Sequence, residues 1–344
     1  MTDTLTTAPQ PRDRVRHFAR TERTGVATVR REATVQPGMC GPNSLLIGRI
    51  GDWTWETVSE VCGTDVFNAR DPKGRATYLS FYYYRVRSGG SLLHPRAISF
   101  GDRLEVISRV FGYGSESVLT LHRIRRIGSG PGSLDAEVLR EDSFEPEEFY
   151  ERPRPDCLYV ENFNRWVARG RSDSNVGLVR ASPADFCHAQ LPRLPDAYSP
   201  RLACNGARSE HRFLDPLTAG YVPLGEEFTT EHPVDVSSDV NGVGLLYFAS
   251  YFAIADGALL KLWRSLGRSD RSFLDRTLLD SRVCYLGNAD VDSTLRLRAR
   301  PWHRAGDRAE ELVELVVEDL ATDRTLAVCS FEIRREVERH ADAA

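Results

Sequence analysis

Two stretches decide the fold: GMCGPNSLLIGRIGDWTWETVSEVCG at 38–63 and DVNGVGLLYFASYFAIADGALLKLWRSLG at 239–267. Apolar residues recur in both at the spacing of an amphipathic helix, and each stretch ends on a glycine, the residue type that favours a helix C-terminus. They predict helices over 52–62 and 247–266. A loop of small residues leads into each helix.

The segments around the two helices follow the same order, which predicts an internal repeat. In the first copy, a strand that ends near Gln36 precedes the helix, and the long strand 76–88 and a hairpin follow it. The second copy has an equivalent strand, helix and set of alternating segments. The predicted strands are 76–88, 100–111 and 115–127 in the first copy, and 278–287, 288–302, 310–320 and 325–337 in the second.

A long helix wrapped by a curved antiparallel sheet is the hot-dog arrangement, so the repeat predicts an α+β double hot-dog fold of two tandem units. A second copy covers the open edge and face that one unit leaves exposed. Two unrelated α+β domains are the alternative. The expected divisions are a disordered arm at 1–25, a first unit at 26–130, a connecting segment with a short helix at 131–225 and a second unit at 226–340.

One segment within the connecting region is itself rich in aromatic residues. CLYVENFNRWVARG at 157–170 is interpreted as a short strand or turn that runs into a helix. Its apolar spacing predicts that this helix buries Tyr159, Phe163 and Trp166.

Composition excludes several classes of function. The net charge of -4 disfavours a nucleic-acid binder, and no apolar run approaches the roughly 20 residues that cross a membrane. The N-terminus lacks the apolar stretch of a signal peptide, so a cytoplasmic protein is expected. The seven cysteines are scattered and the eight histidines show no i, i+4 pair, so we expect neither a disulfide framework nor a metal site.

The strand 76–88 carries the strongest chemical signal, because alternation places Tyr78, Tyr82 and Tyr84 on one face. Aromatic residues favour strands and pack there, which by itself accounts for any single tyrosine. Alternatively, a phenol can donate a hydrogen bond to an enolate or act as a nucleophile. Tyr78 is the best candidate because it opens the strand directly after a turn, with Tyr82 and Tyr84 as alternatives.

The loops before the two helices are candidates for substrate binding through Asn43, Ser44, Asn241 and Gly242. Small residues there let backbone amides converge at a helix start, which suits a thioester oxygen or an enolate. Ordinary helix capping is the alternative. The predicted site is a tunnel between the halves that ends near Tyr78 and both loops.

Three other residues have the right chemistry for catalysis. Asp239 and Glu56 stand where hot-dog thioesterases often keep a carboxylate, but no partner is visible in the sequence, so surface or capping roles are expected. His122 is expected to be a satisfied core or rim histidine. Arginines near a tunnel mouth could hold the phosphates of coenzyme A.

Several segments of the sequence resemble sequences from the family of the bifunctional acyltransferase/decarboxylase of leinamycin biosynthesis and its relatives in other polyketide pathways. The similarity spans nearly the whole chain after the N-terminal arm and includes the rare pair Trp53 and Trp55. The segments that carry the resemblance are 39–66, 77–89, 100–124, 157–166, 194–200 and 232–256.

The resemblance implies a double hot-dog homodimer that converts methylmalonyl-CoA to propionyl-acyl carrier protein through an active-site tyrosine. Tyr78 is the best match for that residue, and Tyr82 and Tyr84 stay open. No cofactor is implied apart from coenzyme A as part of the substrate. The competing functions are an acyl-CoA or acyl-carrier-protein thioesterase, a dehydratase and a non-catalytic acyl-carrier binding module, because fold alone does not choose among them.

Overall fold

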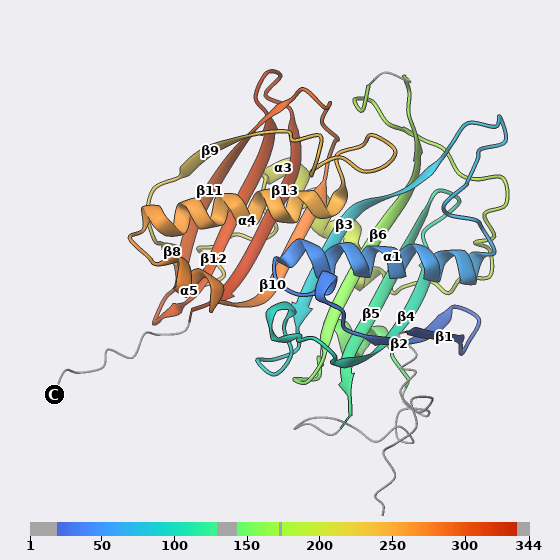
Figure 1. Cartoon of the computed structure of the whole chain (residues 1–344), viewed down its shortest axis with the longest axis horizontal. Coiled ribbons are helices and arrows are strands. Elements are labelled where there is room, and N and C mark those ends of the chain that lie inside the picture. The colour runs from blue at the N-terminus through green and yellow to red at the C-terminus, as the bar shows by residue number, and fades with distance from the viewer. Residues whose placement is uncertain (1–18, 129–142, 172–173, 336–344) are drawn as a thin grey trace, which may run out of the picture.

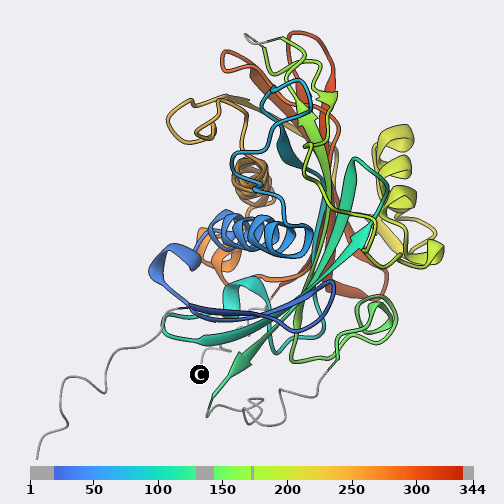
Figure 2. The ribbon, with the colours of Figure 1, turned by 90° about the vertical axis from the view of Figure 1, so that its right-hand side faces the viewer.

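A computed structural model describes residues 19–128, 143–171 and 174–335 of the chain. In this part of the protein thirteen strands form one antiparallel sheet, which curves around two long helices, α1 (Asn43–Cys62) and α4 (Phe248–Ser265) (Figure 1). Figure 2 shows both helices on one side of the sheet and α3 (Pro200–Glu210) on the other. No helix of the described part has the length and hydrophobicity that a membrane span requires.

The sheet consists of two units with the same internal order. The first unit has the order β2-β4-β5-β6-β3 and the second has the order β9-β11-β12-β13-β10. The first contains β2 (Thr28–Thr34), β3 (Tyr78–Ser88), β4 (Arg103–Gly112), β5 (Ser117–Ile127) and β6 (Leu158–Ala168). The second contains β9 (Phe228–Pro233), β10 (Thr277–Tyr285), β11 (Thr294–Arg304), β12 (Asp307–Asp319) and β13 (Thr325–Arg334).

The two units meet where β3 pairs with β10 in the antiparallel direction. Equal strand orders joined in this way relate the units by an approximate two-fold rotation. The predicted double hot-dog α+β fold is therefore confirmed. The smaller elements are β1 (Ala19–Arg23), α2 (Pro146–Tyr150), β7 (Val179–Arg180), β8 (Tyr221–Pro223), α5 (Asp270–Leu274) and 3-10 turns at Pro37–Met39, Pro95–Ala97 and Asp196–Tyr198.

Helix α1 begins nine residues before the predicted start, at Asn43, and contains Gly48 and Gly51. Glycine disfavours a helix interior, so the local sequence obscures this start. The packing of α1 against α4 explains the glycine at 51, because a Cβ there would lie 2.1 Å from Cζ of Phe248. As predicted, α1 ends at Gly63, which has a left-handed φ of 65°.

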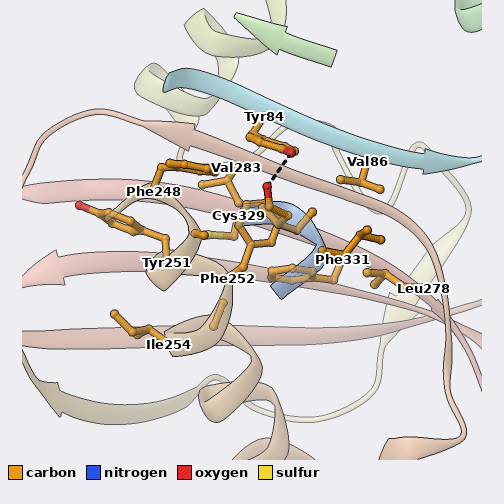
Figure 3. Close-up of a cluster of buried hydrophobic side chains, with 14 of the residues drawn as sticks. Tyr84, Val86, Phe248, Tyr251, Phe252, Ile254, Leu278, Val283, Cys329 and Phe331 are labelled. Carbon is orange, nitrogen blue, oxygen red and sulfur yellow. Dashed lines mark hydrogen bonds between the residues drawn. The ribbon is translucent and has the colours of Figure 1, made fainter. Parts of the chain in front are cut away.

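The core between the helices and the sheet combines both units. Figure 3 shows Tyr84 of β3 among side chains of α4, β10 and β13, including Phe248 and Phe331. Phe248 lies 4.0 Å from Phe81 between ring centroids. This continuous core holds the two units together on the helix side.

Two predictions about local structure are wrong. Residues 157–170 contain the strand β6 in place of a helix, because the segment is hydrogen-bonded between β3 and β5 on both edges. Its polar side chains are buried as well, and Asn162 donates a 2.6 Å hydrogen bond to Oγ1 of Thr54. In the arm that we expected to be disordered, Ala19–Arg23 form β1 on the edge of β2, whereas 1–18 lie outside the described residues.

Candidate active site

The central ladder between the units is short, and a cavity begins where it ends. The β3–β10 pairing runs from Arg87 and Asp280 to Tyr83 and Cys284. Beyond this point Tyr78–Phe81 stay paired with β6 and separate from β10. A cavity of about 620 Å³ occupies the opening, lined by Tyr78–Tyr82 from one unit and Tyr285–Asn288 from the other.

The walls of this cavity are largely aromatic and apolar. Trp55 of α1 closes one side, and its Nε1 donates a 2.9 Å hydrogen bond to the carbonyl of Leu79. The other walls come from both faces of the sheet and from the loop before α4. They include Phe81, Tyr247, Phe248, Tyr251, Leu246 and Leu286.

A β-bulge separates the tyrosines of β3. Phe81 pairs with Asn164 and Tyr83 with Phe163, so Tyr82 is an extra residue that shifts the alternation. Tyr82 and Tyr83 pack on the α3 side of the sheet, and Tyr84 packs in the core on the helix side. The expectation that Tyr78, Tyr82 and Tyr84 share one face is therefore wrong.

The three candidate tyrosines differ in their access to the cavity. Tyr78 is half-buried and lines the cavity, and within the described residues its hydroxyl makes no hydrogen bond. Tyr84 does not line it, is completely buried and donates a 3.2 Å hydrogen bond to the carbonyl of Ile47. Burial raises the pKa of the Tyr84 phenol well above its ordinary value. A ligand in the cavity can thus meet Tyr78 and not Tyr84.

Tyr82 also lines the cavity, but two arginines engage it. Arg208 of α3 donates a hydrogen bond to its hydroxyl, and Cζ of Arg165 lies 3.8 Å from its ring centroid. Burial raises the pKa of the Tyr82 phenol. Tyr82 therefore belongs to the cavity wall on the α3 side and is held there by two arginines, whereas the Tyr78 hydroxyl is available to a ligand in the cavity.

The loop before α4 reaches the cavity, and Asn241 and Gly242 line it. Oδ1 of Asn241 accepts hydrogen bonds from the amides of Val243 at 3.1 Å and Leu245 at 3.0 Å. This side-chain oxygen thus holds the loop itself. The Asn288 side chain makes two 3.0 Å hydrogen bonds to the backbone of Leu246, and nothing in the sequence pattern signalled this role.

The described side chains of the equivalent loop before α1, residues 39–42 and Ser44, do not line this cavity. Asn43 opens α1 and Ser44 lies in its first turn, but α1 contributes Trp55, three turns later. The approximate two-fold rotation explains the difference, because it exchanges the two ends of the antiparallel β3–β10 ladder. The starts of α1 and α4 consequently belong to opposite ends, and the prediction that both loops meet at one site is wrong.

The cavity lining in the described part of the chain contains no Asp, Glu, His, Lys or Cys. Asp239 lies outside the cavity. Its Oδ2 lies 2.7 Å from Nε2 of His232 and accepts a 2.9 Å hydrogen bond from the amide of Asp235, so the side chain holds a turn. Glu56 pairs with Arg31 at 2.7 Å. The ionisable groups that remain at the cavity are tyrosines and the arginines Arg165, Arg180, Arg208 and Arg324.

His122 is a satisfied core histidine, as expected. It lies 2.9 Å from Oγ1 of Thr54 and 2.8 Å from Oγ of Ser108. Burial lowers its pKa to about 3, so it stays neutral at physiological pH. It takes no part in the cavity.

Comparisons with known proteins agree with this architecture. The family described as the LnmK N-terminal Hot Dog Fold domain matches residues 30–216, just over half of the chain. No curated protein matches the sequence.

Two solved structures share the fold. One is the 12:0-ACP thioesterase from Umbellularia californica, with a TM-score of 0.55 and 12% identity over 91% of this chain and 95% of that one. The other is described as an oleoyl thioesterase from Lactobacillus plantarum, with a TM-score of 0.57 and 12% identity over 92% of this chain and 99% of that one. At this identity the likeness concerns the fold alone.

Proposed function

We propose that this chain, which belongs to the LnmK N-terminal Hot Dog Fold domain family, decarboxylates methylmalonyl-CoA and transfers the propionyl group to an acyl carrier protein. One observation carries the proposal: an aromatic cavity with an open phenol at Tyr78 and, in the described chain, no carboxylate or imidazole in its lining. The acceptor is a carrier-protein thiol, and the enzyme acts as a homodimer.

Decarboxylation suits this cavity because it needs no base to abstract a proton. The C–C bond to the carboxylate breaks, CO₂ leaves, and the electron pair moves onto the thioester oxygen as an enolate, which then takes one proton at carbon. In the loop before α4, the backbone amide of Gly242 makes no hydrogen bond to another described residue, and we assign it as the donor to this oxygen. Apolar walls at Phe81 and Phe248 favour loss of a charged carboxylate as neutral CO₂.

For acyl transfer, we assign the role of the nucleophile to Tyr78. Its phenol oxygen attacks the thioester carbonyl, the coenzyme A thiolate leaves and takes up the phenol proton, and an ester forms on the tyrosine. The carrier-protein thiol then attacks this ester and regenerates the phenol. The proposal holds whether decarboxylation comes before or after formation of the ester.

In the described part of the chain, the cavity lining offers no carboxylate or imidazole base for the alternative hydrolytic and dehydrating activities. A thioesterase has to activate water, and a dehydratase needs a histidine or carboxylate beside its substrate. The three candidates for these roles, Asp239, Glu56 and His122, all make structural contacts away from the cavity.

The test is to incubate the full-length protein with methylmalonyl-CoA and a phosphopantetheinylated carrier protein, and to weigh both proteins intact. We expect the carrier to gain a propionyl group. Free propionate or methylmalonate with an unchanged carrier would instead indicate a thioesterase. No turnover, with binding retained, would indicate a binding module, and either result contradicts the proposal.

A further inference from the structure

A second cavity of about 440 Å³ adjoins the first on the α3 side of the sheet. Arg165 and Arg180 line both cavities, so the two cavities are neighbours that share these side chains. The second is polar, and its other lining residues are Tyr113–Ser117 and Arg201 of α3. The arginines therefore lie between the α3 face and the aromatic interior.

Positive charge gathers between these two cavities. Arg165, Arg180 and Arg201 line the second cavity, and Arg208 lies beside them at Tyr82. Glu116 is the one carboxylate that lines the second cavity in the described residues, and it lies 3.6 Å from Arg180 in an exposed pair. Arg165, Arg201 and Arg208 thus have no carboxylate partner among the described residues.

These three arginines contact aromatic rings rather than carboxylates. Cζ of Arg165 lies 3.8 Å from the Tyr82 ring centroid and Cζ of Arg201 lies 5.3 Å from that of Tyr113. Arg208 donates to the Tyr82 hydroxyl. In the described chain none of the three forms an ion pair, whereas Arg85 and Arg282, on the same sheet, both pair with Asp280.

We propose that Arg165, Arg201 and Arg208 bind the phosphate of a phosphopantetheine arm that enters from the α3 face and extends into the cavity of Tyr78. Guanidinium groups match phosphate oxygens with paired hydrogen bonds, and several cations around one polar cavity suit a phosphate diester. The inference rests on the proposed function for the identity of the arm. Both coenzyme A and a loaded carrier protein contain this phosphate.

Calorimetric titration of the full-length protein with 4′-phosphopantetheine and with pantetheine tests the site without turnover. We expect 4′-phosphopantetheine to bind about 10- to 100-fold more tightly than pantetheine, as charge-assisted hydrogen bonds provide. Arg165→Gln and Arg201→Gln should each remove a large part of this difference. Arg201→Gln should also leave pantetheine binding unchanged, because Arg201 lines only the second cavity. Arg271→Gln is the control, because Arg271 is 81% exposed and pairs with Asp275 on α5.

The same variants are then titrated with coenzyme A and with the loaded carrier protein. Weaker binding of either one supports the site and identifies which partner uses it. Equal affinity of the wild type for 4′-phosphopantetheine and pantetheine, or variants that behave like Arg271→Gln, would overturn the inference. A protein that binds phosphate through these arginines but does not decarboxylate methylmalonyl-CoA keeps the inference and loses the proposed function.

Discussion

Tyr83 and Cys284 form the last residue pair of the ladder that joins the two units. On one side of this pair the sheet is continuous, and on the other side the strands separate and the cavity begins. The bulge at Tyr82 lies directly next to it. Bulges bend a strand and end regular pairing, so the irregularity of β3 and the opening of the cavity occur at the same place.

The role of Tyr78 leads to a test with three outcomes. If Tyr78 is the nucleophile, Tyr78→Phe abolishes transfer and any acyl increment in the intact mass of the enzyme after brief exposure to methylmalonyl-CoA. If its phenol only donates to an enolate, the rate falls by about 10²- to 10³-fold. A near-normal rate would reduce Tyr78 to a packing role.

Tyr82→Phe and Tyr84→Phe are the matched controls for this test. Tyr84→Phe loses the hydrogen bond to Ile47 and should cost about 1 kcal/mol of unfolding free energy while acylation persists. An acyl increment that survives in Tyr78→Phe but disappears in Tyr82→Phe would transfer the assignment to Tyr82.

Contact between the two long helices makes Gly51 sensitive to substitution. In Gly51→Ala the new methyl group would meet the ring of Phe248 at 2.1 Å, and that ring is itself packed on Phe81. We expect a loss of about 1 to 3 kcal/mol in unfolding free energy, measured by urea denaturation. Gly257→Ala on α4, where a Cβ has no neighbour within 4 Å, should stabilise the protein by up to about 1 kcal/mol. Equal effects at both sites would contradict this explanation.

The charges at the unit junction predict a strong effect of Asp280→Asn. Arg85 and Arg282 lie opposite each other in the β3–β10 ladder, and Asp280 contacts them at 2.6 and 2.8 Å. Removal of the buried carboxylate leaves two half-buried cations together, with Glu332 still 3.6 Å from Arg282, and should cost about 3 kcal/mol of unfolding free energy. The exposed pair of Arg264 and Asp270 is the control, because water screens these charges and Asp270→Asn should change the unfolding free energy far less. Thermal or chemical denaturation of both variants measures the difference.

The low pKa of the buried His122 predicts that the folded protein loses stability in acid. Its folded pKa of about 3 lies below the ordinary value of about 6.5, so between these pH values the unfolded chain binds the proton and the folded protein does not. The stability that neutral His122 contributes is therefore present above about pH 6.5 and is lost as the pH falls, by up to about 1.4 kcal/mol per pH unit. Denaturation of wild type and His122→Gln between pH 4.5 and 7.5 measures this, and parallel pH profiles for the two proteins would refute it.

The sequence by itself determined the repeat and the order of most elements, with the exception of β6. Periodicities such as those of 76–88 and 248–265 depend on the local backbone geometry of a strand or a helix, so they are readable without any partner. The same holds for the end of α1 at Gly63 and for the aromatic character of β3. These local features were enough to predict two equivalent units, their central helices and Tyr78 as a candidate at a strand start.

Only the tertiary structure decided which of these residues meet. The face of Tyr84 depends on the bulge that β3 forms against β6, and β6 is a strand because two neighbouring strands pair with it. The two-fold arrangement of the units brings the loop of Asn241 to the cavity of Tyr78 and places the start of α1 at the opposite end of the β3–β10 ladder. Arg165 of β6 comes close to Arg201 and Arg208 because α3 packs on one face of the sheet that contains β6. Contacts of this kind depend on strand register and on packing between distant segments, which local periodicity does not encode.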